Sequence, residues 1–233
     1  NLTLSGGTLT GAGQLSLSGA TNTWSGGAFS GNVRVALGGT LALNGGTKNL
    51  KSGAQITNEG TVVWSAGTID TSEASNGSST ITNASGGLFD IQGDLALTTS
   101  DGTGGAFTRT VSFVNQAGAE LRRSSGTGIA QLGGAVSDDQ ALFNLANSGT
   151  VNVQTGTLRI NLAGTTSSTG GSFQIASGSL LEYASGTQTF NGVTVSGAGD
   201  LRLSGGSITY TGASTTNSLQ LTGGTLTVGT GAT

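Results

Sequence analysis

The stretch LANSGTVNVQTGTLRINL, residues 145–162, decides the fold. Apolar and polar residues alternate in Val151-Asn152-Val153 and again in Leu158-Arg159-Ile160, which is the period-two pattern of half-buried β-strands. Only Gln, Thr and Gly residues separate the two groups, and such short polar segments are typical of turns. The stretch is therefore either a tight hairpin or two sides of a coil that repeats along the chain.

A tetrad motif recurs near both ends of the sequence and distinguishes these alternatives. It combines one large apolar residue, small residues and one or two glycines, and it begins at Leu4, Trp24, Leu43 and Trp64, and again at Tyr183, Leu203 and Leu221. The steps are 20, 19 and 21 residues in the first set, and 20 and 18 residues in the second. Each interval contains short strands with glycine-rich corners, which predicts a triangular coil of about 20 residues and not a hairpin.

The middle of the sequence is less regular. Asn58, Asn83, Asn115 and Asn147 each end a strand-like segment, at steps of 25, 32 and 32 residues. We interpret these segments as coils that carry loop insertions, and we expect the Asn side chains to stack and hydrogen-bond along the axis. The predicted loops are Thr71–Ser79, Thr98–Phe107, Arg123–Gln140 and Ala163–Gly171.

The sequence thus predicts an all-β fold, a right-handed single-stranded parallel β-helix (a β-solenoid) with coils of about 18–21 residues. The variable coil length favours the right-handed form. We expect one domain, residues 1–233, with regular coils in 1–70 and 172–233 and loop-bearing coils in 71–171. Strands about 4.8 Å apart would give about 11 or 12 coils and a rod of roughly 50–60 Å. Neither end shows a helical cap, which indicates a fragment of a longer chain.

The alternation also predicts which side chains face the core. The inward set is Leu2, Leu4, Leu15, Leu17, Val33, Val35, Leu41, Leu43, Val151, Val153, Leu158, Ile160, Val193, Val195, Leu201, Leu203, Leu226 and Val228. The outward set is Thr3, Ser16, Arg34, Ala42, Asn152, Arg159, Thr194, Arg202 and Thr227.

Several runs, LTLSGGTLTGAG, TWSGGAFSG, ITNEGTVVWSAGTI and LANSGTVNVQTGTLRI, resemble repeats of large secreted bacterial surface proteins. These include autotransporter passenger regions and filamentous-haemagglutinin-like adhesins. The resemblance covers most of the chain and implies a right-handed parallel β-helix exposed at a cell surface. It carries over no catalytic residue.

The composition excludes several classes of protein. The sequence has no His and no Cys, which excludes Ser-His-Asp and Cys-His catalysis and removes the usual zinc ligands. The net charge is −3 without a basic stripe, so we expect no nucleic-acid partner. No apolar run approaches the about 18 residues of a membrane helix, so we expect no membrane insertion. We predict no catalytic, cofactor-binding or metal-binding residues and no cofactor.

Paired carboxylates are the remaining catalytic option, because β-helical polysaccharide lyases and glycosidases use clustered acids on one outer face. The candidates are Asp70 with Glu73, Asp90 with Asp94, and Asp138 with Asp139. We interpret all of them as solvated turn residues. Asp138 and Asp139 form the densest acidic loop and are also the candidates for a Ca²⁺ site, although the calcium-binding nonapeptide repeat is absent.

The aromatic residues raise a sugar-stacking hypothesis. Trp24 and Trp64 occupy the tetrad position that Leu fills elsewhere, so we predict that both pack in the core. Tyr183 has the same position and the same prediction. Tyr210 lies elsewhere in its coil and is the better candidate for an exposed ring.

An ice-binding face would need a regular ladder of outward Thr-x-Thr pairs. The pairs that follow successive tetrads are Thr8/Thr10, Ala28/Ser30, Thr47/Asn49 and Thr68/Asp70. This ladder breaks at its second step, so the pattern does not favour ice binding.

The leading hypothesis is a non-enzymatic structural or adhesive segment of a bacterial surface or secreted fibrous protein, located outside the cell or on its surface. It would act as a stiff spacer whose length scales with coil number. Its partners would be host or environmental surfaces, glycans, or copies of itself end to end. The alternative is a polysaccharide-binding or polysaccharide-cleaving β-helix.

Overall fold

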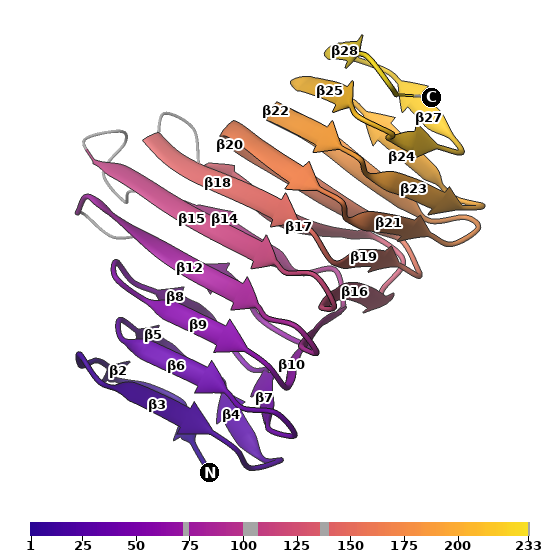
Figure 1. The fold of residues 1–233 in the computed structure, drawn as a ribbon. Helices are drawn as coiled ribbons and strands as arrows, with labels where there is room; N and C mark the ends of the chain where they lie inside the picture. Colours follow the sequence, from indigo (N-terminus) through magenta and orange to yellow (C-terminus); the bar gives the residue numbers. More distant parts are fainter. Residues whose placement is uncertain (72–74, 100–106, 136–139, 233) are drawn as a thin grey trace.

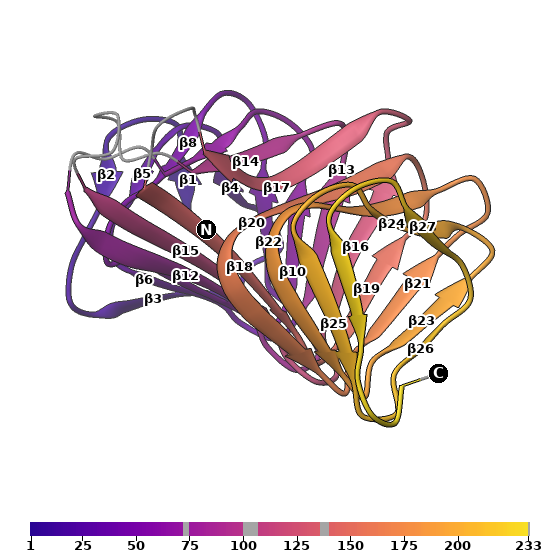
Figure 2. The same ribbon diagram turned by 90° about the horizontal axis from the view of Figure 1, so that it is seen from above.

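The computed structural model describes residues 1–71, 75–99, 107–135 and 140–232, and these contain 28 β-strands and no helix. The chain winds into three-sided coils, and strands of successive coils lie side by side and parallel (Figure 1). The view along the stack shows the strands surrounding a narrow interior with right-handed winding (Figure 2). The predicted parallel β-helix is confirmed.

Three parallel sheets, here called A, B and C, form the sides of the solenoid. Sheet A contains β1 (Thr3–Leu4), β4 (Asn22–Trp24), β7 (Thr40–Leu43), β10 (Thr61–Trp64), β13 (Leu88–Gln92), β16 (Glu120–Ser125), β19 (Thr150–Val153), β21 (Ser172–Ile175), β23 (Thr194–Gly197) and β26 (Thr215–Thr216). Sheet B contains β2 (Thr8–Leu9), β5 (Gly27–Phe29), β8 (Lys48–Leu50), β11 (Ile69–Asp70), β14 (Ala96–Thr99), β17 (Ile129–Ala135), β20 (Thr157–Thr169), β22 (Leu180–Asn191), β24 (Asp200–Leu203) and β27 (Leu219–Leu221). Sheet C contains β3 (Gln14–Leu17), β6 (Asn32–Val35), β9 (Gln55–Asn58), β12 (Gly77–Asn83), β15 (Thr108–Asn115) and β18 (Gln140–Asn147).

The third side of the solenoid continues beyond sheet C. The long strands β20 and β22 bend from sheet B onto this side, and their mutual register shifts between Ile160 and Thr165. Beyond the bend, Ser168 Oγ of β20 accepts a hydrogen bond from Asn147 N of β18 at 3.1 Å. The strands β25 (Ser207–Thr211) and β28 (Thr225–Val228) then extend the second half of β22. The third side therefore runs from β3 to β28, at the front of Figure 1.

The number of coils is smaller than predicted. Sheet A has one strand per coil, and its ten strands give ten coils where 11 or 12 were expected. At about 4.8 Å per coil the stack is about 45 Å long. From Leu4 to Trp64 the paired residues step by 20, 19 and 21, but from Trp64 to Val153 they step by 27, 32 and 30. The long middle coils contain the residues that the prediction had assigned to additional coils.

The N-terminal tetrads have the predicted register. Leu4 pairs with Trp24, Trp24 with Leu43, and Leu43 with Trp64, all in sheet A. The C-terminal tetrads also align with one another, because Tyr183 pairs with Leu203 and Leu203 with Leu221, but they lie in sheet B. Placing Tyr183 at the same position as the tryptophans is therefore wrong. The motif fits any strand–corner–strand junction, so it serves two different corners of the coil.

Glycine is required where these corners stack. Gly27 has a φ of +78°, and a Cβ there would lie 2.5 Å from the carbonyl oxygen of Gly7 in the preceding coil. Gly67 has a φ of +69°, and its Cβ would lie 2.0 Å from the oxygen of Gly46. Only glycine accepts both the left-handed backbone and the close approach.

Two of the four predicted loops are wrong. The described parts of Thr71–Ser79 and Thr98–Phe107 include corners that lead from sheet B to sheet C. In contrast, β17 crosses Arg123–Gln140, and β20 covers most of Ala163–Gly171. These polar segments form strands because their inward side chains find hydrogen-bond acceptors; Thr166 Oγ1, for example, donates to Leu145 O at 3.0 Å.

The predicted core is confirmed except in the outermost coils. All predicted inward residues from Leu17 to Leu203 are buried, and none of the predicted outward residues is. Leu15 and Val228, however, are 37% and 63% exposed, and Leu2, Leu4 and Leu226 are only partly buried. The first and last coils have a neighbour on one side only, so their inward residues are incompletely covered.

A buried ladder of four Asn side chains forms at the corner between sheets C and A, as predicted. Asn58 Nδ2 donates to Asn83 Oδ1 at 2.7 Å. Asn83 donates to Asn115, and Asn115 to Asn147, each at 2.8 Å. Each second amide hydrogen is directed to a backbone carbonyl of a neighbouring coil; Asn115 Nδ2, for example, donates to Thr150 O at 2.9 Å. The ladder joins the four coils whose lengths differ most.

Candidate functional site

The acidic residues Asp90 and Asp94 do not form a carboxylate pair. Asp90 of β13 is buried and lies 2.9 Å from Arg122 of the next coil, whereas Asp94 lies 2.6 Å from Arg123. Burial raises the pKa of Asp90, but hydrogen bonds from Arg122 and Gln92 outweigh it, and the net pKa lies below the ordinary 3.8. A carboxyl group that stays ionised is unsuited to be the general acid of glycoside cleavage.

The other predicted acidic pairs fall partly outside the described residues. Asp70 accepts a hydrogen bond from Thr98 Oγ1 at 3.3 Å. Glu73, Asp138 and Asp139 lie outside the described residues, so the Asp70–Glu73 pair and the Ca²⁺ hypothesis remain predictions. Within the described ranges, no three His, Cys, Asp or Glu side chains gather closely enough to hold a metal ion.

Ion pairs connect neighbouring coils on all three sides of the solenoid. Arg34 pairs with Glu59 on sheet C, with Nε to Oε1 at 2.9 Å, and Arg159 pairs with Glu182 on sheet B at 2.7 Å. The pair of Asp90 on sheet A completes the set. Burial raises the pKa of Glu182, but the hydrogen bond from Arg159 outweighs it and the pKa is lowered overall. These charges therefore stabilise coil stacking and are held in their ionised forms.

Lys48 is a fully buried cation that sequence reasoning missed. Its Nζ donates to three carbonyl oxygens at the corner between sheets A and B: Asn44 at 3.0 Å, Gly46 at 2.7 Å and Ala66 at 2.9 Å. Burial lowers the pKa of Lys48. The parity of Lys48-Asn49-Leu50 predicts an inward Lys, because Leu50 is a core residue two positions later.

Arg123 has the same role in the longer coils. It is fully buried at the sheet A position that Ile91 and Val153 occupy in the adjacent coils. Its guanidinium donates to Thr155 O at 2.9 Å and to Gly128 O at 3.1 Å. With the salt bridge to Asp94, Arg123 holds together the corners of three successive coils. Such charged groups hold backbone in place and leave no free acid, base or nucleophile at the corner.

The tryptophans pack in the core, as predicted. Trp24 and Trp64 are buried, the Trp24 ring stacks on Phe29 with centroids 4.0 Å apart, and Trp64 Nε1 donates to Gly67 O at 3.0 Å. The prediction for Tyr210 is wrong: its ring is 4% exposed and meets Phe190 edge to face at 5.2 Å. In β25 the parity of Ile208 directs Tyr210 inward.

A polar groove lies on the outer face of sheet A. It has a volume of about 340 Å³ and is lined by Gly118, Ala119, Glu120, Thr150, Asn152 and Gln174. Asn152 Nδ2 donates to Glu120 Oε1 at 2.9 Å, and the pairing of Asn152 with Gln174 places their side chains in successive coils. The two small residues leave the space, and the polar side chains supply hydrogen-bonding groups.

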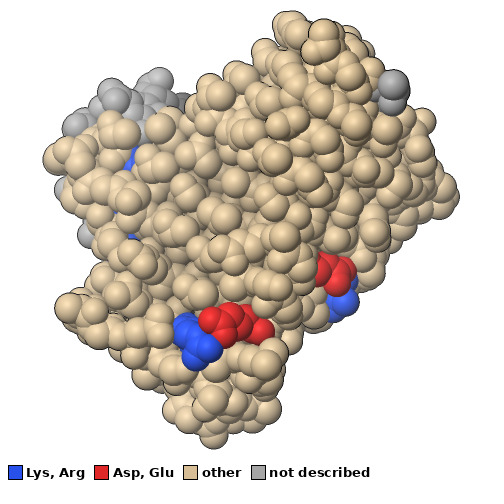
Figure 3. All heavy atoms as spheres, in the orientation of Figure 1, with Lys and Arg blue, Asp and Glu red and all other residues tan. Residues whose placement is uncertain are grey.

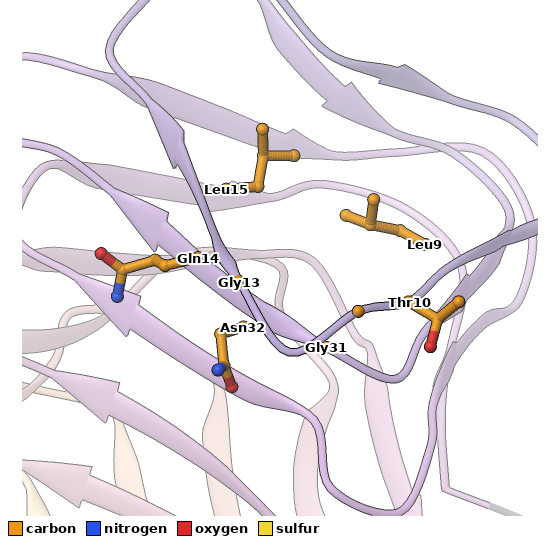
Figure 4. A pocket seen from close by; sticks show the side chains of 8 residues that line it. Leu9, Thr10, Gly13, Gln14, Leu15, Gly31 and Asn32 are labelled. Carbon is orange, nitrogen blue, oxygen red and sulfur yellow. The ribbon is translucent and has the colours of Figure 1, made fainter.

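A second hollow, of about 250 Å³, lies where β2 turns into β3 (Figure 4). Gln14 and Asn32 contribute its polar side chains, and Leu9 and Leu15 its apolar ones. Its lining has no charged side chain, so it offers neither an acid nor a base.

The chain matches no protein-family model, no curated protein and no solved structure. In the part of the chain that the structure describes, no helix is long and apolar enough to cross a membrane.

Proposed function

We propose that this chain is a non-enzymatic structural or adhesive segment of a bacterial surface or secreted fibrous protein, in which it serves as a stiff spacer. The observation that carries the proposal is the continuous bonding from coil to coil. Parallel sheets run along all three sides, and the Asn ladder and the ion pairs add contacts between neighbouring coils. A stack bonded in this way resists bending, because bending must open sheet hydrogen bonds on one side.

The extracellular or surface location rests on the sequence resemblance and is tested on cells. An antibody raised against the chain is applied to intact and to permeabilised cells of the source organism and followed by electron microscopy. We expect labelling of intact cells at a distance from the envelope, or of released fibres. Labelling only after permeabilisation would contradict the proposal.

The groove on sheet A favours polysaccharide binding as a second candidate function. Sugar hydroxyl groups need close-set polar partners, and Glu120, Asn152 and Gln174 present such partners in successive coils. A panel of soluble polysaccharides tested for both retention and turnover separates the candidates. Retention that is lost in Gln174→Ala and kept in Gln220→Ala, on sheet B, would favour binding. Turnover that is lost in Asp90→Asn or Asp138→Asn would overturn the non-enzymatic proposal.

A further inference from the structure

The third side of the last four coils presents an array of hydroxyl side chains, here called the threonine face. It consists of the outward residues of the second halves of β20 and β22, of β25 and of β28: Thr165, Ser167, Thr169, Thr187, Thr189, Asn191, Ser207, Thr209, Thr211, Thr225 and Thr227. None of these side chains is buried, whereas the residues between them point inward. The face lies at the upper front of Figure 1.

Strand pairing orders the array in two directions. The central file along the axis is Ser167, Thr189, Thr209 and Thr227, each paired with the next. The adjacent file is Thr165, Thr187, Ser207 and Thr225. Hydroxyl groups therefore repeat at about 4.8 Å from coil to coil and at roughly 6.6–6.8 Å along each strand. The result is a two-dimensional lattice and not a single stripe.

The interior beneath the face holds this lattice in place. Gln188 Nε2 donates to the buried Ser168 Oγ at 3.2 Å, which links β22 to β20. The Phe190 and Tyr210 rings pack edge to face and link β22 to β25. Threonine is β-branched and stiff at χ1, so the exposed hydroxyl groups lose little freedom on binding.

The face is uncharged, and its central hydroxyl groups are uncommitted. It contains no Lys, Arg, Asp or Glu, and the front of the molecule is almost free of charge apart from two groups near its lower edge (Figure 3). Thr211 Oγ1 donates to Phe190 O at 3.3 Å. Thr189 and Thr209 make no side-chain hydrogen bond to the described residues.

We propose that the threonine face binds ice. The two repeats of the face are close to the oxygen repeats along the a and c axes of hexagonal ice, so a patch four strands wide stays in step with the lattice. Each Thr hydroxyl can replace a lattice water, and each methyl group fills the space between ordered waters. Ice is neutral, and the absence of charge is complementary to it, because a charged side chain would keep its own hydration shell. This inference does not depend on the spacer proposal.

The test measures adsorption to ice. The labelled chain is mixed with slowly growing ice, and the ice and liquid fractions are compared; the freezing point in the presence of a seed crystal is measured in parallel. We expect enrichment in ice and a freezing point below the melting point. Thr209→Lys, at the centre of the face, should abolish both effects. The matched control Thr194→Lys places the same charge in the same coil on sheet A and should leave both unchanged.

Two additions keep the outcome decisive. Circular dichroism confirms that each variant is folded, and Thr189→Lys replaces Thr209→Lys if that variant is not. Crystalline cellulose particles serve as a second surface with regular hydroxyl groups. Exclusion of the wild-type chain from ice, equal adsorption by both lysine variants, or retention on cellulose but not on ice would each overturn the proposal.

Discussion

Replacing Asn115 by Leu tests whether the buried Asn ladder stabilises the long middle coils. Asn115 accepts a hydrogen bond from Asn83 and donates to Asn147 Oδ1 and to Thr150 O, all at 2.8–2.9 Å and with the side chain fully buried. Leucine has a similar size but makes none of these bonds. It leaves the Asn147 Oδ1 acceptor buried without its partner.

The expected loss of stability follows from the number of bonds. Three hydrogen bonds contribute about 1 kcal/mol each, and an abandoned buried acceptor costs a further ~1–3 kcal/mol, partly offset by the added apolar surface. We expect a loss of about 3 kcal/mol. With a denaturant dependence of roughly 1–3 kcal/mol/M in urea, the unfolding midpoint should fall by about 1–3 M.

The matched control is Asn144→Leu, in the adjacent strand β18. Asn144 faces outward, so the same substitution there should change stability by at most about 0.5 kcal/mol. Urea unfolding followed by circular dichroism measures both variants, and hydrogen exchange of β12, β15 and β18 locates the loss. If Asn115→Leu were no less stable than Asn144→Leu, the ladder would be a by-product of folding and the reasoning would be refuted.

Three further predictions address the core and its ionisable groups. Leu43→Asp should abolish hydrogen-exchange protection across Leu2–Ile69 while the C-terminal coils keep theirs, because it buries a carboxylate at a position that is 2% exposed and coupling runs between neighbouring coils; unchanged protection would contradict the register. Because the pKa of Asp90 is lowered in the folded state, its stabilising effect is complete above the unfolded value of about 3.8 and is lost as pH falls further, so Asp90→Asn should flatten the decline of thermal stability between about pH 4 and 2; an unchanged slope would show that Asp90 is not responsible. Burial raises the pKa of Tyr183, and it raises that of Tyr210 to about 12, so stability should fall as pH rises above 10. These are the only two tyrosines, so ultraviolet titration should detect tyrosinate only as the chain unfolds; ionisation near pH 10 in the folded chain would contradict their burial.

The local alternation and the corner chemistry could be predicted from the sequence because both depend on neighbours along the chain. Strand residues alternate between two faces, so Val151 and Val153 had to share a side. The left-handed backbone and close stacking at Gly27 admit only glycine, so the N-terminal tetrads marked equivalent corners. The Asn ladder followed from the same regular spacing.

The assignment of each strand to a side of the coil required the tertiary structure. A tetrad is compatible with more than one corner, so the sequence pattern could not show that Tyr183 lies in sheet B while Trp64 lies in sheet A. The bend within β20 has no local marker, because its Thr and Ser residues resemble a loop until the inward ones meet the carbonyl groups of the preceding coil. This bend is also what places Thr165 in register with Thr187.

The candidate surfaces depend on this assignment for the same reason. The Thr pairs that follow the N-terminal tetrads lie in sheet B and do break, since Thr8 pairs with Ala28 and Ala28 with Asn49. The unbroken array that includes Thr189 and Thr209 lies on another side and in other coils. Alternation along the sequence determines that a residue faces outward, but only the stacking of coils decides which outward residues become neighbours, because those neighbours are about 20 residues apart in the chain and one strand apart in space.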